Sequence, residues 1–131
     1  MDTNFFIDQG HRKFYYAMLI KSDRRDDVYY RSLFYVLGLS KETRERINEL
    51  FDFESRSIKP DALYAGWQTG QSVRLTLLAF NLWSGWTAKG KEHFSTPNGL
   101  FDCSLARYFW EAIRLRYPEY CNRNDYVKEQ S

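Results

Sequence analysis

The side chains best suited to bind a ligand lie close together in the sequence, between positions 67 and 81. The stretch supplies one indole ring, three amides, two hydroxyls and one guanidinium, carried by Trp67, Gln68, Thr69, Gln71, Ser72, Arg74 and Asn81. If a helix over 70–84 extends back by one turn, the ring, the guanidinium and two of the amides share one of its faces. Such groups suit a nucleotide, a carboxylate or a peptide backbone. Backbone N–H groups at the start of a helix also attract anions. We therefore treat these seven residues as a candidate ligand-binding site.

The same stretch also has a purely structural interpretation. Arg74 would pair with an acid from a neighbouring helix, and Asn81 would hold a loop, because buried polar groups are usually satisfied within the protein. This is the more common outcome for such residues, and the sequence leaves both interpretations open. The Gly-Gln-Ser sequence at 70–72 lacks the Lys-Ser/Thr end of a Walker loop, so it does not indicate a P-loop.

The sequence offers little material for catalysis. The two histidines, His11 and His93, are expected at the surface, where either would be an ordinary solvated side chain. Neither Cys103 nor Cys121 has a neighbouring base that would make it a nucleophile. No set of His, Cys, Asp and Glu residues has the spacing of a zinc site. We therefore expect a protein that is not an enzyme and that uses no metal or other cofactor.

Basic residues recur in the segment 104–117. Arg107 and Arg114 are seven residues apart on one helix face, and Glu111 lies between them. This favours a solvated face with ion pairs. The alternative is a phosphate-binding face on which Tyr108 or Trp110 stacks against a base. The net charge of only +2 argues against a protein that coats nucleic acid by charge alone.

Composition indicates one soluble domain. The 131 residues are 44% hydrophobic and 18% aromatic, enough for one core with rings left over for the surface, where Tyr and Trp favour recognition. Two cysteines are too few for a disulfide scaffold, which favours a reduced compartment. Neither a signal peptide nor an apolar run of membrane-spanning length is present. We expect a cytoplasmic protein that does not associate with membranes.

Helical spacing of apolar residues runs through most of the chain. Helices are predicted over 8–22, 28–37, 41–51, 61–65, 70–84 and 104–117. Asp8 and Ser40 are candidate N-caps, Gly38 can close the second helix, and Pro118 should stop the last. The segment 52–59 is expected to be a loop. The segment 87–102 is the least determined, apart from the turn signal Pro97-Asn98-Gly99.

The helix over 70–84 is apolar on nearly every side, which is typical of a helix surrounded by other helices. The predicted fold is therefore all-α: a compact single-domain bundle of five to seven helices around this central buried helix. The domain should cover residues 1–121, and 122–131 should form a polar C-terminal tail.

Several segments together resemble a known family. The matching segments are His11-x-x-Phe14-Tyr15, 33–38 with 42–44, Gly66-Trp67-Gln68-Thr69-Gly70-x-Ser72, 78–82, 100–104 and 111–121. The pattern is similar to a domain-of-unknown-function family of short proteins from Firmicutes, their phages and mobile elements. The resemblance covers nearly the whole chain and implies no catalytic residues. It implies a mobile-element gene, and small genes of that kind often encode proteins that bind and block host defence machinery.

Two functions therefore compete. The first is a non-enzymatic binding protein that inhibits a host defence complex, as anti-CRISPR proteins do, with a host protein or ribonucleoprotein complex as its partner. The alternative is a small-molecule binding protein that sequesters a nucleotide-like signal at the start of the 70–84 helix. Surplus aromatic residues such as Tyr29, Tyr30, Trp83 and Trp86 also leave a homodimer open.

Overall fold

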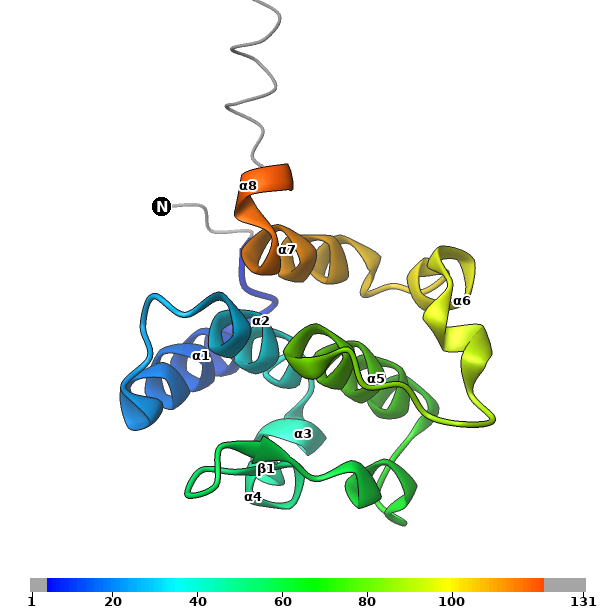
Figure 1. Ribbon diagram of the computed structural model, residues 1–131, viewed down its shortest axis with the longest axis horizontal. Helices are drawn as coiled ribbons and strands as arrows, with labels where there is room; N and C mark the ends of the chain where they lie inside the picture. The colour runs from blue at the N-terminus through cyan, green and yellow to red at the C-terminus, as the bar shows by residue number, and fades with distance from the viewer. Residues whose placement is uncertain (1–4, 122–131) are drawn as a thin grey trace, which may run out of the picture.

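The structure is a computed structural model, and it describes residues 5–121 (Figure 1). The chain forms, in order, α1 (Gln9–Ser22), α2 (Val28–Leu37), α3 (Lys41–Glu45), α4 (Ile47–Leu50), β1 (Phe51–Asp52), β2 (Ser57–Ile58), η1 (Pro60–Tyr64), α5 (Gly70–Ser84), η2 (Glu92–Ser95), α6 (Pro97–Phe101), α7 (Ala106–Arg116) and α8 (Pro118–Cys121). The prediction of an all-α fold is confirmed. The polar tail expected at 122–131 lies outside the described residues. Within the described residues, none of the helices combines the length and the apolar character needed to cross a membrane.

Local capping chemistry fixes where the main helices begin. The Asp8 carboxylate accepts a hydrogen bond from the His11 N–H at the start of α1. Asp27 does the same for the first turn of α2, and the Ser40 hydroxyl accepts from the Thr43 N–H at the start of α3. These side chains satisfy N–H groups that have no partner within the helix. The predicted starts at Asp8 and Ser40 are therefore confirmed.

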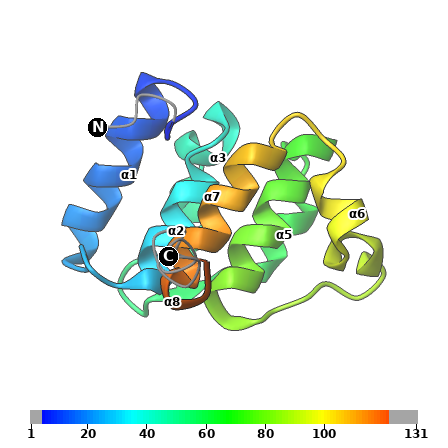
Figure 2. The same ribbon diagram turned by 90° about the horizontal axis from the view of Figure 1, so that it is seen from above.

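Helix α2, rather than α5, occupies the centre of the bundle. Its residues 33–37 are completely buried, and α1, α5 and α7 all pack against it. Figure 2 shows α7 lying over α2, with α1 on one side and α5 on the other. Helix α5 has the predicted bounds, but Gln71 and Asn81 are exposed on its open side. Eight of the 15 residues of α5 are buried, as expected for a largely buried helix. The expectation that it is the central helix is corrected, because α1, α5 and α7 all pack against α2.

Two further segments differ from prediction. The helix expected over 41–51 is interrupted at Arg46, whose φ of −112° and ψ of 27° are not helical. The segment 52–59, expected to be a loop, contains a short antiparallel ladder in which Phe51 pairs with Ile58. The Asp52 carboxylate accepts hydrogen bonds from the N–H groups at 54 and 55, and this local turn brings the two strands together.

His11 is fully buried, so the expectation that it lies at the surface is wrong. Its Nε2 donates to the carbonyl oxygen of Tyr35 at 2.7 Å, and its Nδ1 accepts from the Ile7 N–H at 3.1 Å. Burial lowers the pKa of the imidazole from 6.5 to about 4, so the ring is neutral at pH 7. The spacing in the sequence indicates this burial, because His11, Tyr15 and Leu19 recur every four residues on the buried side of α1.

Candidate functional site

The polar residues at the start of α5 bind one another. The Thr69 N–H donates to the Ser72 hydroxyl at 2.7 Å, and the Ser72 N–H donates to the Thr69 hydroxyl at 3.0 Å. The Gln68 amide donates to the carbonyl oxygen of Ala62 at 3.1 Å and so ties this cap to η1. Gln71 is exposed to solvent. The local function of these residues is therefore to start the helix.

Trp67 and Arg74, two further residues of the predicted stripe, have separate partners. The Trp67 indole N–H donates to a carboxylate oxygen of Glu49 at 3.2 Å, next to α4. The Arg74 guanidinium instead donates to the backbone oxygen of Asp102 at 3.0 Å and lies over the Phe94 ring, 5.4 Å from its centroid. The indole and the guanidinium are thus not brought together into one pocket.

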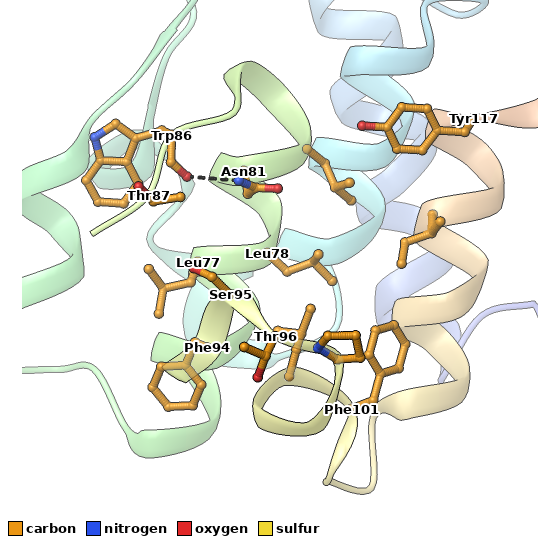
Figure 3. Close-up of a pocket in the computed structure, with 14 residues that line it drawn as sticks. Leu77, Leu78, Asn81, Trp86, Thr87, Phe94, Ser95, Thr96, Phe101 and Tyr117 are labelled. Carbon is orange, nitrogen blue, oxygen red and sulfur yellow. Dashed lines mark hydrogen bonds between the residues drawn. The ribbon is translucent and has the colours of Figure 1, made fainter. Parts of the chain in front are cut away.

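Asn81 connects the predicted stripe to a real cavity. Its amide N–H donates to the backbone oxygen of Trp86 at 3.3 Å and holds the loop that follows α5, as the structural interpretation predicted (Figure 3). The same side chain lines a pocket of about 260 Å³ between α5, η2, α6 and α7. The other lining residues are mostly apolar: Leu77, Leu78, Leu82, Trp86, Thr87, Phe94, Ser95, Thr96, Pro97, Leu100, Phe101, Ile113 and Tyr117. We call this cavity the α5–α7 pocket.

Segment 87–102, which the sequence left undetermined, supplies one wall of this pocket. The Thr96 hydroxyl accepts from the Gly99 N–H at 3.1 Å and starts α6, with Pro97 in its first turn. This Thr-Pro start is a signal that could have been read from the sequence. The carbonyl oxygen of His93 lies only 1.7 Å from the place where a Cβ at Gly99 would stand, so this packing requires glycine.

Arg116 fixes the side of the pocket that belongs to α7. Its Nε donates to the carbonyl oxygen of Leu82 at 3.0 Å. Its guanidinium lies 3.9 Å from the ring centroid of Tyr29 and 4.5 Å from that of Tyr117. A cation close to the faces of both rings is attracted to each, so Tyr117 is held in place beside the pocket.

The outward side of α7 and the following turn expose large aromatic residues. Trp110 is 49% exposed, Tyr117 is 36% exposed, and Tyr120 of α8 is 83% exposed. Arg114 lies on the same side of α7 and pairs with Glu111 at 3.1 Å, as the ion-pair interpretation of this helix predicted. We call Trp110, Arg114, Tyr117 and Tyr120 the α7 face. The opposite side of α7 is anchored on the core by residues such as the fully buried Phe109.

A second hollow lies on the other flank of α7, facing α1. Its volume is about 570 Å³, and Leu115 of α7 lines it together with Tyr16 and Ile20 of α1. Tyr16 is 41% exposed and Ile20 is 59% exposed, so apolar surface continues from α7 toward α1. The hollow is also lined by the charged residues Arg25, Asp26 and Arg31. The α7 face is therefore a ridge between the mostly apolar α5–α7 pocket and this mixed hollow.

The structure also places His93 and Cys103, two of the residues that the sequence offered for catalysis. Between residues 5 and 121, no three His, Cys, Asp or Glu side chains gather as a metal-binding group. His93 is exposed, as expected, and its ring lies 4.0 Å from that of Phe94. The Cys103 thiol donates to the carbonyl oxygen of Leu100 at 3.6 Å.

Comparison with known proteins places the chain in a family. No curated protein and no solved structure matches it. One family model matches residues 1–129, nearly the full length. The chain belongs to that family, which is described as a family of unknown function, DUF6075.

Proposed function

We propose that this chain is a non-enzymatic binding protein whose partner is a protein or ribonucleoprotein complex, and that the α7 face is its binding surface. The observation that carries the proposal is the exposure of Trp110, Tyr117 and Tyr120, which lie in α7, at its end and in the short α8 that follows. Tyr, Trp and Arg are the residues that most often dominate the binding energy of protein interfaces. Large exposed rings beside an arginine therefore favour an interface over an ordinary solvated helix.

The geometry around α7 supports the same proposal. Helix α7 is a rigid platform, because Phe109 and Ala112 are completely buried against the core. The exposed rings need no rearrangement to meet a partner, which lowers the entropic cost of binding. The hollow that faces α1 offers concave surface beside the ridge, and partner side chains can fill it.

The proposed source, compartment and target of the protein rest on the family resemblance in the sequence. The protein would come from a phage or mobile element of Firmicutes, act in the cytoplasm, and inhibit a host defence complex. Its small size and the thin supply of catalytic groups suit an inhibitor that works by occupying a surface. The nucleotide-binding alternative at the start of α5 has less support, because Trp67 and Arg74 bind separate partners and Thr69 and Ser72 bind each other.

A capture experiment with matched variants tests the proposal. Tagged wild-type chain, a Trp110→Ala/Tyr120→Ala variant and a Tyr64→Ala variant are each incubated with Firmicute lysate. Tyr64 is 62% exposed and belongs to η1, which packs beside α4, far from α7 (Figure 1). A partner held by wild type and by Tyr64→Ala, but lost by the α7 variant, is the expected result. Equal recovery with all three chains would overturn the assignment of the surface.

A second copy of the chain could occupy the same face and form a homodimer. Light scattering of the purified protein across a concentration series separates this case from a host partner. We expect a monomer in wild type. A dimer that dissociates in the Trp110→Ala/Tyr120→Ala variant would show that the face serves self-association instead.

A further inference from the structure

We propose that the α5–α7 pocket binds a neutral, planar molecule of one or two rings with a hydrogen-bond donor and acceptor on one edge, the chemistry of an uncharged nucleobase. This site goes beyond the protein-binding function and does not depend on it. It also differs from the nucleotide site expected at the start of α5, with which it shares only Asn81.

The size of the pocket fits such a molecule. A dry engineered cavity of about 150 Å³ is large enough to hold benzene, and this pocket measures about 260 Å³. Its floor is formed by leucines that are almost fully buried, including Leu77, Leu78 and Leu82. Rings of Phe94 and Phe101 add flat apolar walls. An apolar floor with aromatic walls stabilises a planar ring system by burial and by ring contacts.

The charge of the lining restricts the ligand to a neutral group. None of the residues that line the pocket is Asp, Glu, Lys, Arg or His. Arg74 and Arg116 each lie over a ring of the lining, but they donate to the backbone oxygens of Asp102 and Leu82. A phosphate or carboxylate placed in the pocket would lose its hydration without gaining a cation, which is costly.

The polar residues of the lining are Asn81, Thr87, Ser95, Thr96 and Tyr117, of which Asn81 comes from α5 and Tyr117 from the end of α7. The Asn81 N–H group is directed to the Trp86 carbonyl oxygen, and this bond leaves the amide oxygen as an acceptor. In Figure 3 that oxygen points toward α7, and the Tyr117 ring points back from α7 toward α5. The Thr96 hydroxyl, by contrast, already accepts from Gly99 and donates to the carbonyl oxygen of His93. An amide oxygen and a phenolic hydroxyl on one side match a ligand with a donor and an acceptor on one edge.

Titration of the full chain with four probes tests the proposal. Adenine is neutral with a polar edge, indole has one donor, toluene has no polar group, and benzoate is charged. Methyl chemical shifts of Leu77, Leu82 and Ile113 report binding in the pocket. We expect adenine to move these signals at the lowest concentration and benzoate to leave them unchanged.

Two hydroxyl deletions identify the polar edge. Tyr117→Phe should weaken adenine binding about two- to tenfold, the typical effect of losing one hydrogen bond, and leave toluene binding unchanged. Tyr120→Phe is the matched control, because Tyr120 is 83% exposed and does not line the pocket. Trp110→Ala separates this site from the protein-binding surface, since it should leave adenine binding intact.

Three results would overturn the proposal. The first is the absence of any shift at the three methyl groups with every probe. The second is benzoate binding as tight as adenine binding. The third is an equal loss of adenine affinity in Tyr117→Phe and Tyr120→Phe.

Discussion

Acidification should destabilise this protein through His11. The imidazole is completely buried, and burial lowers its pKa from 6.5 to about 4. In the unfolded chain the ring takes up a proton as the pH falls through 6.5, whereas the folded chain resists protonation until about pH 4. The unfolded state therefore binds more protons in this window, and the free energy of unfolding decreases as the pH falls.

The magnitude follows from the two pKa values. Each unit of pKa difference is worth about 1.4 kcal/mol. Protonation of His11 in the unfolded chain therefore lowers the free energy of unfolding by about 2 kcal/mol between pH 7 and pH 5. The full loss is about 3 kcal/mol and is reached below pH 4. The hydrogen bonds explain why the neutral ring is required. Nε2 donates to the Tyr35 oxygen at 2.7 Å, and Nδ1 must stay unprotonated to accept from the Ile7 N–H.

Urea unfolding followed by circular dichroism at pH 7 and pH 5 measures this effect. The chain offers a matched pair of variants, because its other histidine, His93, is exposed. His93→Gln should keep the full decrease between the two pH values. His11→Gln should start from a lower stability but lose most of the pH dependence. A His11→Gln variant that shows the same decrease as His93→Gln would refute the role assigned to the buried ring.

Three further changes should each have a defined effect. Thr69→Ala removes the N-cap of α5 and should lower the free energy of unfolding by about 1 kcal/mol in a urea titration. Gly99→Ala places a Cβ against the His93 carbonyl oxygen and should destabilise the chain by about 1–3 kcal/mol. Gly66→Ala meets no atom within 4 Å and is its control in the same titration. Arg116→Met removes the hydrogen bond to α5 and the contacts with two rings, and should speed amide exchange in α7.

Features determined by neighbouring residues could be predicted from the sequence. The capping side chains Asp8 and Ser40 lie within three residues of the N–H groups they bind, so the helix starts were readable. The bounds of α5 follow from a cap at its start and a left-handed glycine, Gly85 with φ 76°, at its end. The hairpin after α4 was missed because its ladder is only two residue pairs long and gives no alternating pattern.

Features that depend on distant contacts could not be predicted in the same way. The apolar surfaces of α2 and α5 look alike in sequence, and only the packing of α1, α5 and α7 shows that α2 is central. The stripe from Trp67 to Asn81 was a reasonable pattern, but α4 lies on one side of it and α6 on the other. Each polar group therefore donates to a separate partner: the Trp67 indole to Glu49, and the Arg74 guanidinium to the Asp102 carbonyl oxygen. The pocket itself combines residues of α5, η2, α6 and α7 between positions 77 and 117, and their packing is not readable from local spacing.

The proposal that the α7 face binds a partner is tested most directly by hydrogen–deuterium exchange. The chain is measured alone and in the complex recovered from the host lysate. Slower exchange in residues 106–121, with little change in residues 41–64, is the predicted result. Protection confined to residues 41–64 would contradict the proposal, because it would place the partner on α3, α4 and η1 instead of on α7.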